Sequence, residues 1–315
     1  MAGGQERILR GRIRSIQATK KITRAMELIS ASRIAKAQGA VQAAVPYSEQ
    51  ITEVVRHLSV GGASPDFPLL QGRDEIMTTC YIVIGADRGL CGGYNAGVER
   101  AAEGEIKADV LRDRGYLVVP VGRKVETYFR FRGYQMGTAF GGFSEAPSFE
   151  DAREIGQYAV ELFTSGEVDR VELVYTRFIS PGNQEVVLRP LVPLSSVTGA
   201  RIDGVEHPTG TPAFDFDFEP DPSTILEVLL PRYVQARVFA ALLNAAASEH
   251  AFRQRAMKAA TDNAEELIKT LSRIMNRARQ DAITTEIMEI VGGAEALGSD
   301  DPAELLELVN ALADD

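Results

Sequence analysis

The sequence predicts an α/β protein: a long antiparallel coiled coil of the N- and C-terminal helices, plus a central α/β domain. Three observations lead to this fold class. The 60 residues from Arg232 to Val291 contain neither glycine nor proline. Residues 8–58 show a second long helical pattern, and between the two patterns short apolar runs alternate with helical stretches. Alternation of that kind is typical of an α/β sheet.

The C-terminal pattern predicts one continuous helix, because strong helix formers continue without a breaker from Arg232 to Val291. Such a helix is roughly 90 Å long, too long to bury its apolar face within a compact domain, so it must pack against another helix or a partner. Asp221 and Pro222 suit its beginning, Pro231 predicts a kink or break, and Gly292-Gly293 its end. The expected seam is Val234, Val238, Ala241, Ala245, Ser248 and Phe252, continuing as Leu267, Leu271, Ile274 and Ala278.

The N-terminal helix is expected from Ile8 to about Leu58, with a bend or fraying near Pro46. Two terminal helices of comparable length predict an antiparallel pair, with Leu58 beside Tyr233 and Leu9 toward the far end; two helices of a larger bundle are the alternative. The apolar positions of the N-terminal helix are mostly three or four apart: Leu9, Ile13, Ile16, Met26, Ile29, Val41, Val45, Ser48, Ile51, Val55 and Leu58.

The central part of the chain predicts a Rossmann-like α/β domain that ends in an antiparallel hairpin. Ser148 with Asp151 predicts a capping box at the start of one of its helices. Strands are expected at Ile76–Ile84, Tyr116–Val121, Val171–Ile179 and Gln184–Leu194, and helices from Asn95, over Arg123–Arg132 and from Ser148 to Phe163. The predicted segments are 1–60 (N-terminal helix), 61–75 (linker), 76–197 (α/β domain), 198–222 (connector, with a possible edge strand at Phe214, Phe216 and Phe218), 223–292 (C-terminal helix) and 293–315 (acidic extension).

Composition excludes several classes of protein. The net charge of −10 disfavours nucleic acid as a partner. Cys80 and Cys91 are too few for a disulfide framework, which fits a reducing compartment. The three histidines lie far apart in the sequence without cysteine or acidic neighbours in ligand spacing, so no metal and no other cofactor is expected. No apolar run reaches the 18 or so residues needed to span a bilayer.

A glycine-rich segment, Gly85–Gly93, follows the first predicted strand and invites comparison with phosphate-binding loops. It has neither the Walker spacing nor the G-x-G-x-x-G spacing. The favoured interpretation is a turn that packs the end of a strand against a helix. A nucleotide-binding α/β enzyme remains an alternative, and a coiled-coil scaffold is another.

The first helix is strongly basic. Residues 5–38 contain nine Lys and Arg against two Glu, a local charge of +7. Such a run is usually the solvated face of a helix. With so few carboxylates to form pairs within the helix, it also favours an acidic partner outside the chain.

Four blocks of sequence resemble the gamma subunit of F-type ATP synthase, of the bacterial type: Arg14–Leu28, Asp87–Gly93, Ser248–His250 with Ala256–Asn263, and Ala278–Glu286 through Gly292-Gly-Ala. The resemblance implies the non-catalytic central rotor of a proton-transporting complex, coupling proton flow through a membrane c-ring to ATP synthesis or hydrolysis in beta subunits. It implies one copy per complex, with three alpha subunits, three beta subunits, an epsilon subunit and the c-ring as partners. The expected location is peripheral, on the cytoplasmic side of the plasma membrane.

The same resemblance assigns partner-binding residues. Lys20, Lys21, Arg24 and Met26 match the segment that faces an acidic lever of a beta subunit. Arg253, Arg279, Gln280, Thr284 and Glu286 match upper contacts with beta, and Ile283, Ile287 and Ile290 match an apolar bearing. Ser299–Asp315 extends past the common pattern. Its sequence predicts either a frayed acidic terminus or an amphipathic helix that docks on basic surface and acts as a brake.

Overall fold

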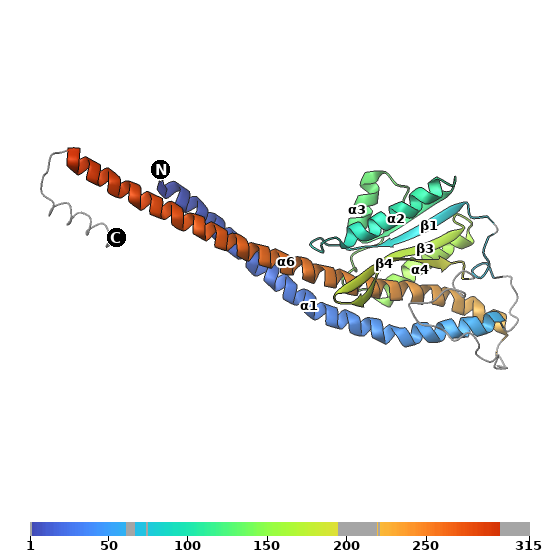
Figure 1. Cartoon of the computed structure of the whole chain (residues 1–315). Coiled ribbons are helices and arrows are strands. Elements are labelled where there is room, and N and C mark those ends of the chain that lie inside the picture. Colours follow the sequence, from blue (N-terminus) through green and yellow to red (C-terminus); the bar gives the residue numbers. More distant parts are fainter. Residues whose placement is uncertain (1, 61–66, 74, 195–218, 220, 297–315) are drawn as a thin grey trace. The chain divides into compact units, whose positions relative to one another are not determined.

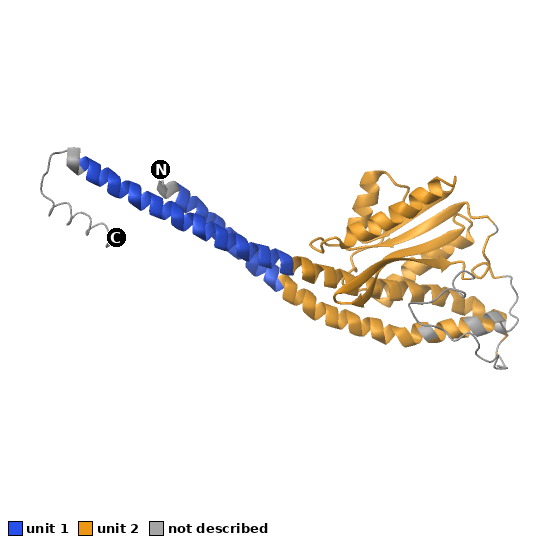
Figure 2. Cartoon of the chain, in the orientation of Figure 1, with its two compact units in different colours: residues 1–25, 258–315 blue, residues 26–257 orange. Residues whose placement is uncertain are grey.

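A computed structural model describes residues 2–60, 67–73, 75–194, 219 and 221–296 (Figure 1). Two compact units make up the chain: residues 1–25 with 258–315, and residues 26–257 (Figure 2). Along the chain the elements are α1 (Ala2–Val60), β1 (Thr78–Ile84), α2 (Tyr94–Val110), β2 (Gly115–Val121), α3 (Arg123–Arg132), α4 (Phe149–Thr164), β3 (Arg170–Ser180), β4 (Asn183–Val192) and α6 (Pro222–Ala296).

The two long helices are confirmed, and both are more continuous than predicted. Helix α1 runs through Pro46, so fraying there was a wrong prediction, and α6 includes Pro231. An interior proline costs about 3 kcal/mol, which the buried residues Ile51 and Val55 just after Pro46 help to offset. Gly292-Gly293 does not end α6, which continues to Ala296; each glycine costs only about 1 kcal/mol in a helix.

The sheet lies in residues 26–257 and has the strand order β2-β1-β3-β4. Strand β1 pairs in parallel with β2 and with β3, while β3 and β4 form the predicted antiparallel hairpin. The sequence placed these strands within about two residues of their observed ends. Helix α4 begins with the predicted capping box, in which the Asp151 N–H donates to Ser148 Oγ at 3.2 Å and the Ser148 N–H to Asp151 Oδ2 at 2.7 Å.

This unit has three layers, because the sheet is covered by helices on both of its faces (Figure 1). Alternate residues of β1 point to opposite faces: Tyr81 and Val83 pack with α2 and α3, while Cys80 and Ile82 pack with α4 and α6. Because both faces are covered, the strands are apolar nearly throughout, as a buried parallel sheet requires.

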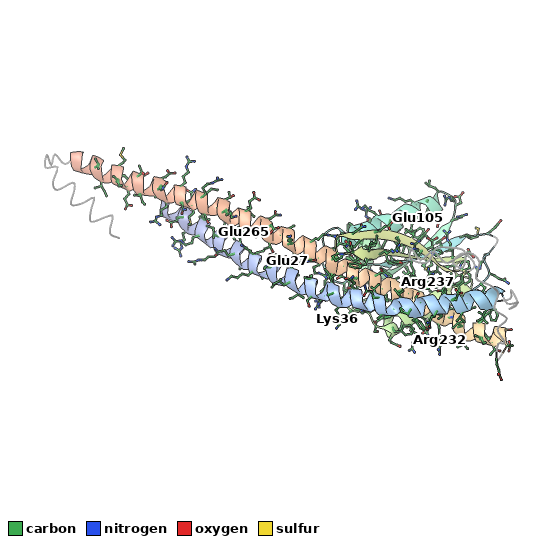
Figure 3. All side chains as sticks on the ribbon, turned by 60° about the horizontal axis from the view of Figure 1, so that its bottom comes forward. Glu27, Lys36, Glu105, Arg232, Arg237 and Glu265 are labelled. Atoms are coloured by element: carbon green, nitrogen blue, oxygen red, sulfur yellow. The ribbon has the colours of Figure 1, made fainter. Side chains whose placement is uncertain are left out.

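Within the same unit, α1 and α6 contribute to the lower layer of this core. Leu58 of α1 and Tyr233 of α6 belong to one buried cluster, as the antiparallel arrangement predicts. The first half of the α6 seam is likewise confirmed, since its first five positions are buried and Phe252 is partly buried. Arg237, which projects from α6 (Figure 3), lies over the Tyr233 ring at 5.9 Å and donates to the Pro190 carbonyl oxygen at 3.5 Å.

In the unit made of residues 1–25 and 258–315, two contacts give the helix register. The hydroxyls of Thr23 and Thr261 lie 2.8 Å apart in a buried position, and Lys20 Nζ lies 3.0 Å from Glu265 Oε2. Lys20 precedes Thr23 on α1, whereas its partner Glu265 follows Thr261 on α6, so the two helices are antiparallel. By this register α1 begins opposite about residue 282 of α6.

Two of the four positions in the second half of the predicted seam were wrong: Leu267 and Ile274 are 52% and 44% exposed. The other two, Leu271 and Ala278, are half-buried as predicted. A spacing of three and four is kept by buried or half-buried residues at Thr261, Ala264, Ile268, Leu271, Met275 and Ala278. On α1, Ile29 and Val45 are also exposed, at 54% and 42%. Part of the observed seam is polar and includes Lys20 and Thr23. A search for apolar residues cannot find these positions.

The register leads to a first prediction. Cysteines at positions 23 and 261 are expected to form an intrachain disulfide under mild oxidation, because the hydroxyl oxygens they replace lie 2.8 Å apart. Non-reducing electrophoresis would detect the bond as a mobility shift. As a control, cysteines at 22 and 261 should not crosslink, because Ile22 is 61% exposed. Disulfides that form only between chains would contradict the antiparallel pair.

Two predictions fall outside the described residues: the edge strand at Phe214, Phe216 and Phe218, and the amphipathic extension Ser299–Asp315. The segment boundaries drawn from the sequence remain predictions.

Candidate partner-binding surfaces

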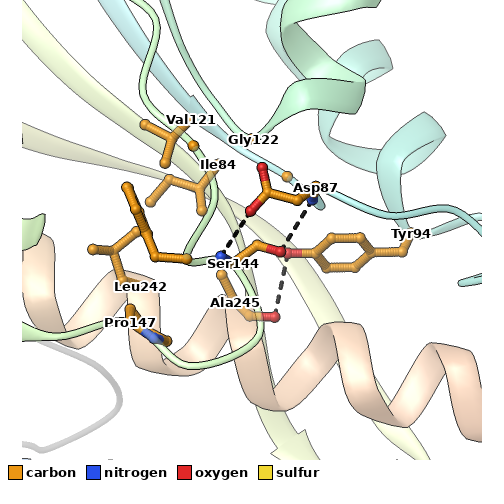
Figure 4. A pocket seen from close by; sticks show the side chains of 12 residues that line it. Ile84, Asp87, Tyr94, Val121, Gly122, Ser144, Pro147, Leu242 and Ala245 are labelled. Atoms are coloured by element: carbon orange, nitrogen blue, oxygen red, sulfur yellow. Dashed lines mark hydrogen bonds between the residues drawn. The ribbon is translucent and has the colours of Figure 1, made fainter.

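Open α/β sheets bind ligands outside the carboxyl ends of their strands, at a switch point that lies between β1 and β3 in a sheet of this order. Beside the neighbouring ends of β1 and β2 the space is nearly filled (Figure 4). A cavity of about 10 Å3 remains between the loop residues Phe143 and Pro147 and the α6 residues Leu242 and Ala245. That is about enough for one water molecule. This part of the chain therefore packs α6 against the sheet.

Asp87 holds the glycine-rich loop in place. Its carboxylate accepts hydrogen bonds from the backbone N–H groups of Gly142, Ser144 and Arg123 at 2.8, 3.0 and 3.2 Å. Burial alone would raise the pKa of Asp87, but these bonds outweigh it and hold the pKa below its ordinary value. A carboxylate used in this way repels phosphate, so the predicted structural role of Gly85–Gly93 fits the observed contacts.

Beside Asp87 lies an open hollow of about 320 Å3 that also contains Arg88 and Arg123. Each of these arginines has a carboxylate within 4.0 Å: Arg88 lies 3.7 Å from Glu145, and Arg123 Nε lies 4.0 Å from Asp87. The hollow is therefore not a cation-lined cradle for a nucleotide. Within the described residues no cluster of His, Cys, Asp and Glu has the makings of a metal site.

Arg253 has a different setting from the one the sequence suggested. It is 5% exposed and donates to Glu249 Oε1 at 2.6 Å. A second carboxylate, Glu145, lies 3.5 Å away and is also bonded by Arg33 of α1. Arg253 therefore joins α6 to the 140–148 loop inside residues 26–257. Its assignment to a beta-subunit contact stays a prediction that the observed burial does not favour.

Burial and the nearby arginines shift the pKa values of the carboxyl groups in this cluster in opposite directions. Burial raises the pKa of Glu249 above its ordinary value, although Arg253 works against the rise. Burial also acts to raise the pKa of Glu145, but the hydrogen bond and charge of Arg33, together with Arg253 and Arg88, lower it overall. The pKa of His250 is lowered, chiefly by burial, so this ring is neutral near pH 7.

On α1, the four assigned residues differ in their surroundings. Lys20 is half-buried and paired with Glu265. Lys21 and Arg24 are exposed, and Met26 is half-buried. Exposed apolar side chains lie near them on the helix, with Ile22 at 61% and Leu28 at 57%. The sequence missed Glu265, which only the corrected register connects with Lys20.

Near the end of α6 the assigned residues lie on the surface. Arg279, Gln280, Thr284 and Glu286 are exposed. Ile283 and Ile287 are 45% and 41% exposed, Ile290 is half-buried, and the neighbouring Met288 is 68% exposed. Past residue 282 this helix has no facing turn of α1, which explains why large apolar side chains remain uncovered.

No helix in the described ranges is long and apolar enough to cross a bilayer.

The family model for ATP synthase matches residues 5–297. The ATP synthase gamma chain of Parafrankia sp. (strain EAN1pec) is 48% identical over 302 residues, which cover 94% of this chain and 99% of the relative. The gamma chain of Saccharopolyspora erythraea is 45% identical over 311 residues and covers 94% and 98%, respectively.

Solved structures share the fold. A chain of the Euglena gracilis mitochondrial ATP synthase, in a structure of OSCP/F1/c-ring, aligns with a TM-score of 0.63 at 17% identity and covers 94% of this chain and 95% of its own length. A chain of the Tetrahymena thermophila mitochondrial central stalk/c-ring aligns with a TM-score of 0.54 at 22% identity, covering 76% and 99%. Since the family model spans nearly the whole chain and relatives reach 48% identity, the chain belongs to the family of ATP synthase gamma chains.

Proposed function

We propose that the chain is the central-stalk rotor subunit of an ATP synthase. Its rotation couples proton flow through the membrane c-ring to ATP synthesis or hydrolysis at the beta subunits. The observation that supports this most is the division between an α/β domain whose space beside the ends of β1 and β2 is nearly filled and a long helical pair with exposed apolar and basic side chains. The subunit itself is non-catalytic.

The partners follow from the family. We infer one copy per complex, set within three alpha and three beta subunits, with the epsilon subunit and the c-ring on the α/β domain. The complex is membrane-associated. We infer a peripheral position on the cytoplasmic side of the plasma membrane, which agrees with the absence of a candidate membrane span in the described residues.

Two surfaces would meet the beta subunits. The first is basic and contains Lys21 and Arg24, with Met26 beside them and Lys20 shared with Glu265. The second is the end of α6, where Arg279, Gln280, Thr284 and Glu286 surround the isoleucines at 283, 287 and 290. Apolar side chains let the helix turn inside a sleeve without being held in one ion-paired position.

Coupling then depends on asymmetry, because each rotor angle presents a different face to each beta subunit. Driving one site from 1:99 to 99:1 requires about 5.5 kcal/mol of differential interaction. An exposed ion pair contributes roughly 0–1 kcal/mol. Many contacts must therefore share the coupling.

The two alternative functions have less support. A nucleotide-dependent enzyme needs a cleft, and beside the ends of β1 and β2 residues of α6 leave space for about one water molecule. A scaffold unrelated to rotation would not account for a family match over residues 5–297. A tagged chain should recover the alpha and beta subunits from its own cells; recovery without them would contradict the rotor.

Replacing Lys20, Lys21 and Arg24 together by alanine is expected to lower the number of protons pumped per ATP hydrolysed in reconstituted complexes. Single replacements of Lys21 or Arg24 should change it little, because each exposed pair is worth about 1 kcal/mol or less. Lys20→Ala also removes the contact with Glu265, so helix pairing is checked by circular dichroism.

Lys36→Ala is the matched control, an exposed cation farther along α1. It should leave pumping unchanged. A single alanine at 21 or 24 that abolishes coupling alone would contradict shared contacts.

A further inference from the structure

The last turns of α6 present an apolar face that no described residue covers. Ile283 and Ile287 are 45% and 41% exposed, and Met288 and Val291 are 68% and 38% exposed. Positions 283, 287 and 291 recur every four residues, so they line one side of the helix. Large side chains in such a row indicate a docking surface.

A basic surface lies close to this row in the same compact unit. The first turns of α1 carry Arg7, Arg10 and Arg14, which line an open hollow with Gly11 and Glu6. Glu6 is bonded to Arg10 at 2.6 Å, so three cations are matched by one carboxylate there. Ile8, in the same turn, is 62% exposed. The register places these residues opposite about 271–278 of α6, one to four turns from Ile283.

Residues 297–315 have the complementary chemistry. They contain six Asp and Glu and no Lys or Arg. Asp301-Pro302 with Glu304 predicts a helix start, and Leu305, Leu308, Val309 and Leu312 then fall on one face. The match to the family model ends at residue 297, so nearly all of this segment lies outside it.

The segment is long enough to reach both surfaces. It follows directly on the end of α6 at Ala296. Four extended residues span about 13 Å, and a helix over 301–313 spans about 20 Å. Directed back along α6, this length covers about 22 residues, from 296 to about 274. The segment then passes Ile287 near the start of its helix, Leu305 lies beside about Ile283 and Leu312 beside about residue 276, and the carboxylates toward its end reach the arginines of α1.

We propose that residues 297–315 fold back on α6 and bind this composite surface, Ile283, Ile287, Met288 and Val291 of α6 with Arg7, Arg10 and Arg14 of α1. A second copy of the chain is the less favoured occupant, since it would bring its own arginines to the same cations. Because the segment is tethered, its effective concentration is on the order of millimolar, and a weak contact suffices. Its regulatory meaning rests on the proposed function: the covered residues are those assigned to the beta subunits, so the segment competes with them.

Alkylation of a cysteine in place of Ile287 tests the docking in the isolated full-length chain. At low salt the rate is expected to be at least about threefold lower than in a chain truncated after Gly298, the protection given by a segment bound two-thirds of the time. Mass spectrometry resolves the engineered thiol from the buried Cys80 and Cys91. The protection should vanish in 1 M salt, where charges are screened beyond about 3 Å. It should also vanish when the six carboxylates become Asn or Gln.

Leu267→Cys is the matched control, because it is 52% exposed on the same helix and beyond the reach of the segment. Its rate should not depend on residues 299–315. Equal rates at position 287 with and without the segment at low salt would overturn the proposal. Protection that rises with protein concentration would replace the segment by a second copy as occupant. Neither result depends on rotor function, which the pumping measurement tests separately.

Discussion

Replacing Gly122 by alanine is expected to lower the free energy of unfolding by about 2–6 kcal/mol. Gly122 follows β2 with a φ of +109°, and a Cβ built there lies 2.5 Å from the Gly85 carbonyl oxygen. The backbone conformation costs roughly 1–3 kcal/mol for a residue with a side chain. Overpacking against backbone, which cannot rotate away, adds roughly 1–3 kcal/mol. Urea denaturation of the isolated chain, followed by circular dichroism, measures the change.

Gly133→Ala separates the two costs. Gly133 also has positive φ, +73°, but a Cβ built there meets nothing within 4 Å. It should therefore lose about 1–2 kcal/mol from backbone strain alone. If both variants lost the same amount, the close approach of the loops after β1 and β2 would not be the reason for glycine at 122.

The sequence predicted the strands and helices of the α/β domain well but not how they pack, because packing joins residues that are far apart in the chain. Apolar runs and a capping box locate strands and helices, because those signals are local. The space beside the ends of β1 and β2 is nearly filled by Leu242 and Ala245, which follow Gly122 by about 120 residues. No local pattern connects such positions. The sequence could argue against a phosphate loop from spacing, but it could not show what occupies the space.

The seam of the helical pair shows a second limit. A search for apolar residues finds only the apolar positions at which the two helices meet. It misses Thr23 and Thr261, which meet through their hydroxyl groups. Ile29, Leu267 and Ile274 are apolar but exposed. The helices of a rotor subunit carry one pattern of side chains for each other and another for partner subunits. The sequence of each helix then contains two overlapping patterns of apolar residues. Hydrophobicity alone does not tell the residues that face the other helix from those that face partners.

The candidate site was predictable to the extent that it follows the family. Exposure of Lys21, Arg24, Arg279 and Gln280 agrees with residues that face partners. Arg253 does not fit that pattern, because Glu249 lies one turn before it and Glu145 comes from a loop over 100 residues away. The i, i+4 spacing of Glu249 and Arg253 was visible in the sequence, but their burial was not.

Replacing Arg253 by methionine is expected to lower the free energy of unfolding by about 3–5 kcal/mol at pH 7, because it leaves Glu249 buried without its cation. Arg255→Met is the matched control: Arg255 is exposed and bonds Gln184, so its loss should cost less than about 1 kcal/mol. Equal losses in the two variants would show that the buried pair is dispensable.

The loss in Arg253→Met should also depend on pH. Burial already raises the pKa of Glu249, and without Arg253, which works against that rise, the pKa should be higher still. A carboxyl whose folded pKa lies above its unfolded pKa binds its proton more tightly when folded. Its contribution to stability is therefore full below the unfolded pKa and is lost as pH rises through the folded pKa. The variant should recover part of its loss between pH 7 and pH 5. Adding Glu249→Gln to Arg253→Met should give a similar recovery at pH 7, since a neutral amide needs no cation; a double variant as unstable as Arg253→Met alone would assign the loss to packing of the arginine stem instead of charge.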